Sequence, residues 1–247
     1  MFPLKDDVPT QSFPAVTVAL IVVNVAVYLY EFLLGFPGLD ASRTVATSAD
    51  RALRAFIYEF GLVPCRFTDS CPPALSTVLA GAPLPWMTVI SSMFLHGGFL
   101  HVAFNMLYLW IFGNNVEDAM GKGRFVVFYL LCGAIAAAAQ FTSDPASAVP
   151  MIGASGAVSG TLGAYVVLYP QARVWTLVIF GFFWRFIPVP ALVVLGFWFL
   201  GQLVGGVTSF GSKEGGVAFL AHIGGFLAGM ALIFVFRQRP RLAYRRY

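Results

Sequence analysis

Charged side chains are scarce in this sequence, and their scarcity excludes an ordinary soluble domain. Of 247 residues, 15 are Lys or Arg and 11 are Asp or Glu, which makes the chain 11% charged against 59% hydrophobic. Soluble domains carry about 25% charged residues on average. Together with a mean hydropathy of +0.81, this composition indicates a chain that buries most of its surface in a lipid bilayer.

Several catalytic and nucleotide-binding motifs are also absent. The sequence has neither a P-loop nor a dinucleotide-binding glycine fingerprint. His96 and His101 lack the His-Glu-x-x-His arrangement of zinc proteases, and 153-GASG-156 is not the Gly-x-Ser-x-Gly of a strand-borne nucleophile elbow. We therefore expect no cofactor and no metal site.

Long apolar segments are what the sequence does contain. A helix needs about 20 apolar residues to cross the hydrocarbon of a bilayer. Six segments approach this length, at roughly 14–35, 93–113, 124–142, 154–170, 189–209 and 217–236. The first is longer than the apolar core of a signal peptide and lacks a small-residue cleavage pattern, so we expect it to stay as a spanning helix. The sequence thus predicts an all-α polytopic membrane protein with a six-helix core over 14–236.

The distribution of Lys and Arg predicts the orientation in the membrane. With a cytoplasmic N-terminus, ten of these residues lie inside and five outside, and four of the five lie in the long loop 36–85, where the rule is weaker. We therefore expect the segment 1–13 and the basic tail 237–247 to be cytoplasmic. The tail then lies beside anionic lipid, and we expect no nucleic-acid partner.

The three cysteines divide between the outer loop and a span. Cys65 and Cys71 lie in the loop with five residues between them. An oxidising compartment would permit a disulfide there, and the sequence leaves open whether it forms. Cys132 lies in the third span, where it is most simply a small buried hydrophobic residue.

The polar residues inside the spans gather at one depth. The chain has three histidines, His96, His101 and His222, and all lie in or beside apolar segments. With the N-terminus inside, the second, fourth and sixth spans run from outside to inside. His101 and Asn105 of the second span, Ser155 at the start of the fourth and His222 near the start of the sixth then share the outer half of the membrane. Ionisable groups at this depth are costly and often mark function.

Small residues predict how the fourth and sixth spans meet. Gly156 and Gly160 form one small-xxx-small surface, and Gly225 and Gly229 form another. Such surfaces let helix backbones approach closely. Contact along them would carry the serine of the fourth span to the histidine of the sixth.

A serine hydroxyl within reach of an imidazole is the minimal activated nucleophile. The first N–H groups of a helix lack internal partners, so those around Ser155 are available to a developing oxyanion, and His101 and Asn105 add side-chain donors. No carboxylate lies at the same depth to orient His222. The pattern therefore favours a Ser–His dyad.

These motifs resemble the rhomboid intramembrane serine proteases. The resemblance rests on 96-HGGFLHVAFN-105, 153-GASG-156 and 221-AHIGGFLAG-229, in this order and in alternate spans. The stretches 113-GNNVEDAMGKGRF-125 and 169-YPQARVWTL-177 are similar to the bacterial branch, which implies a bacterial inner membrane.

The resemblance implies a role for each site residue. Ser155 would be the nucleophile and His222 the general base, with His101 and Asn105 stabilising the oxyanion. The loop 36–85 would lie partly in the outer leaflet. Substrates would be single-span transmembrane proteins cut near the outer membrane surface, and no cofactor would be needed.

Three positions depart from the better-known members of that family. Ser159 stands where they carry a tyrosine that stacks on the base, which leaves open how the base is held. Trp86-Met87 replaces Trp-Arg, and 117-EDA-119 replaces Glu-x-Arg. None of these changes removes a reacting group.

Two other functions remain as alternatives at this point. A non-catalytic relative would bind and escort membrane proteins, and a transporter or channel would use the histidines as a proton relay. The first usually lacks the serine or the histidine, and the second does not explain 153-GASG-156. The resemblance, together with the bulky apolar stretch 195-LGFWFLGQLV-204, implies that a gate for substrates involves the fifth span.

Overall fold

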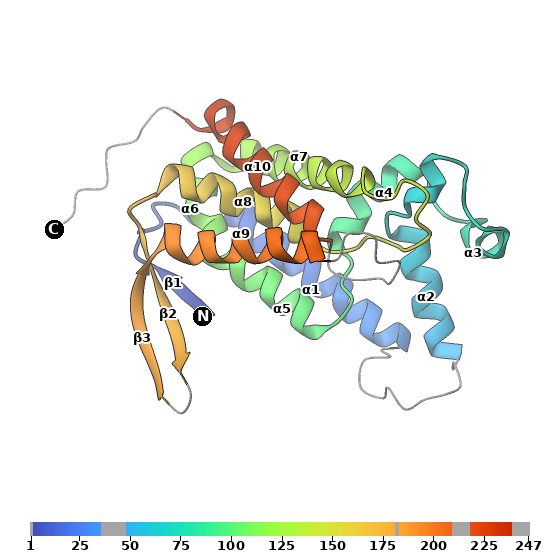
Figure 1. Cartoon of the computed structure of the whole chain (residues 1–247), viewed down its shortest axis with the longest axis horizontal. Helices are drawn as coiled ribbons and strands as arrows, with labels where there is room; N and C mark the ends of the chain where they lie inside the picture. The colour runs from blue at the N-terminus through green and yellow to red at the C-terminus, as the bar shows by residue number, and fades with distance from the viewer. Residues whose placement is uncertain (1, 36–47, 181–182, 209–217, 239–247) are drawn as a thin grey trace.

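The computed structural model describes residues 2–35, 48–180, 183–208 and 218–238, and helices dominate these residues (Figure 1). The first part of the expected outer loop, 36–47, lies outside the described residues, as do Lys213, Glu214 and the end of the basic tail, 239–247.

Helices occupy each of the six apolar segments. They are α1 (Ala15–Gly35), α5 (Phe99–Tyr108) with its continuation, α7 (Lys122–Phe141), α8 (Ser155–Leu168), α9 (Ala191–Thr208) and α10 (Phe219–Phe236). By length and hydropathy α1, α7 and α10 can each cross a bilayer alone, whereas α8 and α9 are shorter apolar helices. A six-helix bundle is thus present, and the lengths of its members differ.

The second apolar segment is not one helix over 93–113. Helix α4 (Pro85–Ser91) and the 3-10 turn η3 (Ser92–Phe94) precede a break, and the chain then bends by 83°. Beyond the bend α5 continues through a π-helical turn, η4 (Leu109–Gly113), into α6 (Asn114–Met120). The helix that carries His101 therefore begins at Phe99, six residues later than expected.

Helix α8 is the central helix of the bundle. All ten residues from Gly156 to Tyr165 are buried, and α7, α9 and α10 lie around it (Figure 1). A helix that is apolar on every face is typically enclosed by others. Because α8 is short and enclosed, its first residue, Ser155, lies inside the molecule near one end of the bundle.

The N-terminal segment is tied to α6 by two carboxylates, of which Glu117 is buried. Glu117 accepts hydrogen bonds from the backbone N–H of Val16 at 3.1 Å and from the N–H and hydroxyl of Thr17, both at 2.8 Å. A carboxylate at this position satisfies free N–H groups of α1 and complements the helix dipole. Asp118 accepts from the backbone N–H of Gln11 at 2.6 Å. The departure from Glu-x-Arg therefore preserves an anchoring role for the glutamate.

A second buried carboxylate, Asp6, lies where this segment meets the bundle. Its Oδ2 accepts hydrogen bonds from Asn115 Nδ2 and from the Tyr165 hydroxyl, each at 2.6 Å. Burial is the main cause that raises the pKa of Asp6 to about 6 from its ordinary 3.8. Asp6 thereby joins the N-terminal strand to α6 and α8.

The sequence pattern does not predict the three-stranded antiparallel sheet that follows α8. Strands β2 (Arg173–Phe180) and β3 (Phe183–Pro190) pair antiparallel, and β1 (Phe2–Asp6) pairs with β2. Val174 and Thr176 are buried, whereas Trp175, Trp184 and Phe186 are exposed on the opposite face. The segment is rich in β-branched and aromatic residues, which favour strands, but it shows no clear apolar–polar alternation.

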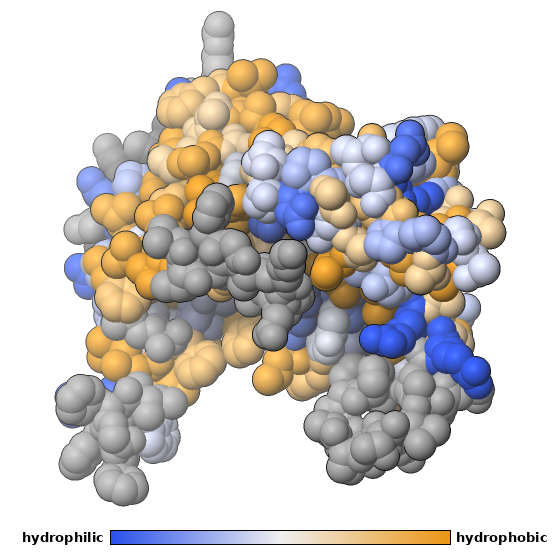
Figure 2. All heavy atoms as spheres, turned by 45° about the vertical axis from the view of Figure 1, so that its right-hand side comes forward, coloured by the Kyte–Doolittle hydropathy of each residue, from blue (hydrophilic) through white to orange (hydrophobic). Residues whose placement is uncertain are grey.

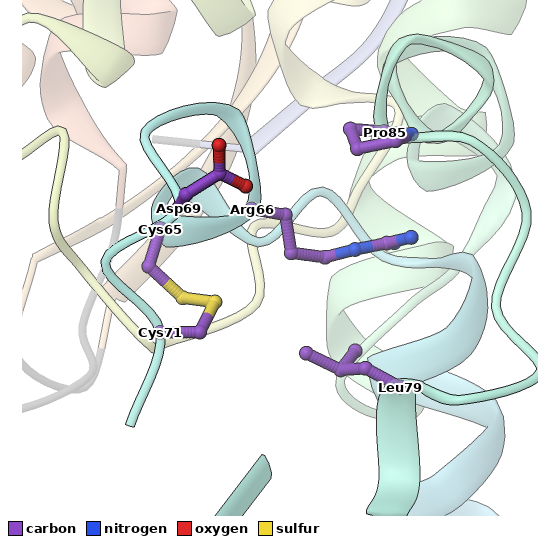
Figure 3. A pocket seen from close by; sticks show the side chains of 6 residues that line it. All are labelled: Cys65, Arg66, Asp69, Cys71, Leu79 and Pro85. Atoms are coloured by element: carbon purple, nitrogen blue, oxygen red, sulfur yellow. A yellow bond between two sulfur atoms is a disulfide. The ribbon is translucent and has the colours of Figure 1, made fainter. Parts of the chain in front are cut away.

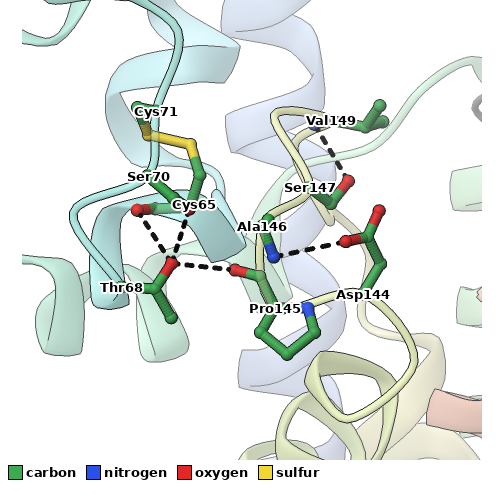
Figure 4. Close-up of a disulfide and its surroundings, with 9 residues drawn as sticks. All are labelled: Cys65, Thr68, Ser70, Cys71, Asp144, Pro145, Ala146, Ser147 and Val149. Carbon is green, nitrogen blue, oxygen red and sulfur yellow. Dashed lines mark hydrogen bonds between the residues drawn. A yellow bond between two sulfur atoms is a disulfide. The ribbon is translucent and has the colours of Figure 1, made fainter.

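The described part of the outer loop folds over the segment that leads to Ser155. It contains α2 (Ser48–Phe60), η1 (Pro64–Phe67), η2 (Pro73–Leu75) and α3 (Ser76–Leu79). Cys65 and Cys71 form a disulfide with a Cα–Cα distance of 4.8 Å (Figure 4). The pairing that the sequence left open is therefore present.

The disulfide loop is hydrogen-bonded to both sides of its surroundings. The Cys65 N–H donates to Ser147 O at 2.9 Å, and the Thr68 hydroxyl donates to Pro145 O at 3.2 Å (Figure 4). On the other side Arg66 extends toward α3 and α4 (Figure 3) and donates to Pro83 O at 2.5 Å. These bonds hold the segment before Ser155 against the outer loop.

Apolar side chains cover much of the surface (Figure 2). Leu33, Phe197 and Val235 are exposed by 81%, 68% and 76%. Large exposed apolar patches indicate contact with protein or membrane. On helices of this hydropathy, lipid is the expected contact.

Candidate active site

Ser155 and His222 are brought together by α8 and α10. The Ser155 hydroxyl and His222 Nε2 lie 2.8 Å apart, although 67 residues separate them in the sequence. This distance is that of a hydrogen bond between a nucleophile and its base. The pair that the spacing of the motifs predicts is therefore in contact in the structure.

Glycines produce this contact by removing side chains between the two helices. A Cβ at Gly229 would overlap the carbonyl oxygen of Gly160, and one at Gly225 would overlap that of Gly156. Only a residue without a side chain allows backbones to lie so close. The two predicted small-xxx-small surfaces therefore face each other, and they set the position of His222 relative to Ser155.

His101 lies beside the nucleophile through a second glycine contact. A Cβ built at Gly153 would lie 2.8 Å from His101 Cε1 and Nε2 and 3.5 Å from Ser155 Oγ. The imidazole edge and the hydroxyl therefore flank the same glycine. Gly153 has φ +125°, which favours glycine, and its N–H donates to Ser92 O at 2.9 Å.

The hydrogen bonds of His101 select a donor tautomer. Its Nδ1 accepts the Gly97 N–H at 3.3 Å. A neutral imidazole with an accepting Nδ1 carries its proton on Nε2, and Nε2 is the atom on the side of Gly153. His101 thus presents an N–H group toward the side of Ser155.

Asn105 shares the helix face of His101, but its amide turns back along the helix. Its Nδ2 donates to His101 O at 2.9 Å, and the side chain is buried. An amide nitrogen carries two hydrogens, so one remains after this bond. The structure therefore brings Asn105 next to His101, while its role toward an oxyanion stays a prediction.

The N-terminus of α8 supplies backbone donors around Ser155. The helix begins at Ser155, and no side chain caps it. The Val158 N–H donates to Ala154 O at 2.9 Å. The N–H groups that precede it in the first turn therefore point out of the helix. Such groups lie at the positive end of the helix dipole and suit a developing negative charge.

Gln202 contacts the imidazole from the opposite side, and the motifs alone did not identify it. Its Oε1 lies 2.7 Å from His222 Nδ1. Gln202 comes from α9, within the stretch 195–204 that reads as an apolar face with one polar residue. That single amide among apolar residues was the available signal, since polar groups in a membrane helix seek partners.

Ser159, which stands where better-known members of the family carry a tyrosine, is hydrogen-bonded to the backbone of its own helix. The Ser159 hydroxyl donates to Ser155 O at 2.6 Å, one turn back along α8. An aromatic ring is instead provided by α9, where Trp198 lies 6.0 Å from His222 between ring centroids at an angle of 40°. Aromatic packing around the His222 imidazole therefore comes from α9.

His96 lies outside the dyad and packs against His101. The two rings are 5.1 Å apart in an edge-to-face arrangement, and the His96 N–H donates to both oxygens of Glu31 at 3.2 Å. Both partners are buried, with His96 3% and Glu31 2% exposed. The bond from the backbone N–H of His96 to Glu31 ties α1 to the bend that precedes α5. Among the residues that the structure describes, no three His, Cys, Asp or Glu side chains group as metal ligands would.

Residues 83–239 match the model of the rhomboid domain family. The match includes all the site residues described above and covers more than half of the chain. The chain belongs to the rhomboid family. Its helical bundle with apolar outer surfaces makes it an integral membrane protein of the rhomboid type.

Similar rhomboid proteins come from bacteria, fungi and plants. The chain is 37% identical over 147 residues to the Rhomboid protease GluP of Bacillus subtilis, covering 60% of this chain and 26% of that protein. It is 32% identical over 151 residues to Rhomboid protein 1, mitochondrial, of Saccharomyces cerevisiae, covering 58% and 40%. It is 26% identical over 251 residues to RHOMBOID-like protein 6, mitochondrial, of Arabidopsis thaliana, covering 96% and 74%. The chain thus spans less than half the length of the first two relatives.

Proposed function

We propose that this rhomboid is an intramembrane serine endopeptidase that uses Ser155 as nucleophile and His222 as general base. The observation that carries the proposal is the 2.8 Å contact between Ser155 Oγ and His222 Nε2. The similarity to a protein named Rhomboid protease in Bacillus subtilis supports the same activity.

The chemistry follows from the groups around the serine. Ser155 Oγ attacks the carbonyl carbon of a peptide bond while its proton passes to His222 Nε2. The carbonyl oxygen becomes an oxyanion, and the N–H groups at the start of α8 and Nε2–H of His101 are its proposed donors, with Asn105 as a further one. The imidazolium then protonates the leaving amine, and water hydrolyses the acyl-enzyme by the reverse proton path.

The proposed substrates are single-span transmembrane proteins cut near the outer membrane surface. A peptide bond within a spanning helix is hydrogen-bonded and shielded by lipid, so it must be unwound and reached by water. Ser155 and His222 are only partly buried, which suits a site open to water.

The proposed placement has both termini in the cytoplasm of a bacterium and spans within 14–236. The excess of Lys and Arg in the loops expected inside supports this placement. Reporter fusions at residue 247 and in the loop 142–154 test it, and we expect the first reporter to be active inside and the second outside. The reverse pattern would contradict the proposed orientation.

The activity is tested with the purified full chain and a model single-span substrate. Wild type is compared with Ser155→Ala, His222→Ala and the matched control Ser159→Ala, which removes a hydroxyl one turn away. We expect cleavage by wild type and Ser159→Ala only. Cleavage that persists in both Ser155→Ala and His222→Ala would refute the dyad, and proton flux without proteolysis would favour a relay.

A further inference from the structure

We propose that Gln202 is a positioning residue for His222, so that α9 takes part in catalysis by holding the general base. This inference rests on the proposed function of Ser155 and His222. Its starting point is the 2.7 Å contact between Gln202 Oε1 and His222 Nδ1. His222 is thereby held at both nitrogens, by α8 through Ser155 and by α9 through Gln202.

The contact lies in a closely packed interface between α9 and α10. Trp198 and Gln202 are four residues apart and Gln202 and Gly205 three, so they share one face of α9. On α10, Phe219 and His222 are three residues apart. A Cβ at Gly205 would overlap the Phe219 ring, and Trp198 lies 6.0 Å from the His222 ring. Close packing on both sides of Gln202 therefore fixes its position along the α9–α10 interface relative to His222.

The hydrogen bonds around Gln202 orient its amide. In this orientation the side-chain nitrogen donates back to Trp198 O at 3.5 Å. The carbonyl oxygen then faces His222 Nδ1 and accepts its N–H. A neutral imidazole with a proton on Nδ1 has an accepting Nε2. This is the tautomer in which His222 can take the proton of Ser155, and the opposite tautomer would turn Nε2 into a donor.

The Gln202 amide takes the place of an acidic orienting group without adding a charge. In many serine hydrolases a carboxylate accepts from the base and stabilises its charged form. A buried carboxylate needs a partner that satisfies its charge, whereas an amide only needs its hydrogen bonds made. In a site lined by apolar helices, an amide dipole aligned with Nδ1–H still favours the imidazolium that forms during attack.

Because Gln202 belongs to α9, the orientation of His222 depends on the position of that helix. Ser155 and His222 are positioned by the tightly packed glycines of α8 and α10, and Gln202 is the polar bridge from the base to α9. Any separation of α9 from α10 would leave Nδ1 without its acceptor. The reactivity of the serine therefore depends on the position of a helix that carries neither reacting group.

The test compares two substitutions at one position in the full-length protein. Gln202→Met keeps the length of the side chain and removes the acceptor, and Gln202→Glu keeps an acceptor oxygen. Leu200→Met, on the opposite exposed face of α9, is the matched control. The measurements are kcat and KM on the model substrate, the thermal midpoint, and the rate at which a small fluorophosphonate labels Ser155.

We expect Gln202→Met to lower both kcat and the labelling rate about 10- to 100-fold, as expected for a lost hydrogen bond to a charged group. KM should change by less than about threefold, because the uniform binding of substrate is untouched. Gln202→Glu should restore most of the labelling rate, and Leu200→Met should behave as wild type. The small probe matters because its reaction does not require a transmembrane substrate to enter.

Normal labelling in Gln202→Met would overturn the inference, as would equally slow labelling in a folded Gln202→Glu. If Gln202→Met does not fold, Gln202→Asn, whose amide is too short to reach Nδ1, replaces it and decides by the same criteria. A wild-type protein without Ser155-dependent cleavage or labelling would refute the proposed function itself, and the positioning role would fall with it.

Discussion

Gly153→Ala tests whether the contact between His101 and the serine is as tight as the structure shows. Gly153 immediately precedes the turn into α8, with φ +125°. A Cβ there would lie 2.8 Å from both Cε1 and Nε2 of His101. The substitution therefore adds one methyl group between the nucleophile and its proposed oxyanion donor.

The expected size of the effect has two parts. Ordinary van der Waals contact begins at 3.4 Å, so the ring of His101 must move by about 0.6 Å, which exceeds the roughly 0.5 Å tolerance of a catalytic arrangement. Loss of one oxyanion donor typically lowers kcat about 10²- to 10³-fold. The backbone conformation also costs an alanine about 1–3 kcal/mol, which lowers the thermal midpoint by several degrees.

The assay is kcat on the model substrate together with the thermal midpoint in detergent. Gly97→Ala is the matched control, because a Cβ there would meet His101 Nδ1 at 3.8 Å, an ordinary contact, and its N–H is retained. We expect Gly153→Ala to lose activity far beyond its loss of stability and Gly97→Ala to lose little of either. A kcat of Gly153→Ala within threefold of wild type, or an equal loss in Gly97→Ala, would refute the reasoning.

Three further perturbations have clear directions. Gly229→Ala should lower both the thermal midpoint and kcat, because its Cβ would overlap a backbone carbonyl of α8, whereas Gly196→Ala, with nothing within 4 Å of its Cβ, should alter neither; equal behaviour of the two would contradict this. Glu117→Ala should lower the free energy of unfolding by about 3 kcal/mol, because donors at the start of α1 lose their acceptor, and an unchanged denaturation midpoint would count against it. Since the pKa of Asp6 is about 6 in the fold against 3.8 ordinarily, the folded state binds more protons between these values and stability should fall as pH rises from about 4 to about 6. Asp6→Asn should remove that part of the pH dependence of the thermal midpoint, and identical profiles would refute the assignment.

The positions of Ser155 and His222 were predictable because their determinants are local. Glycines at spacings of three and four mark the helix faces that approach each other, and the same short motifs carry the reacting groups. Helix α8 begins at Ser155, one residue after the start of the span predicted over 154–170. The glycines therefore predict which helix faces meet, and the polar side chains in the same motifs are brought together with them.

Gln202 could not be assigned to the base from the sequence. A lone amide in an apolar helix signals a partner, but which residue it meets depends on the rotation and depth of α9 relative to α10. Those quantities are fixed by packing such as the Gly205–Phe219 contact, which involves side chains on two helices at once. The sequence predicts a Ser–His dyad without a carboxylate, and it does not specify which other group meets the imidazole.

The bend before α5 and the three-stranded sheet were likewise not predicted from the sequence. The bend before α5 occurs inside a continuous uncharged run, so composition alone extended the second helix back to residue 93. The sheet of β1, β2 and β3 joins residues 2–6 to residues 173–180 and 183–190, and pairing across such a separation leaves no clear signal in either segment.

The sequence by itself determined that this is a helical membrane protein, because the hydrophobic effect and the length of a spanning helix act on composition and run length. It also determined which serine and histidine meet, because close helix packing requires glycine at regular intervals. Only the tertiary structure decided what holds the base, since the 2.7 Å contact to Gln202 depends on the relative placement of three helices. A hydrogen bond is sensitive to fractions of an ångström, and no spacing within one helix specifies the position of its neighbour to that precision.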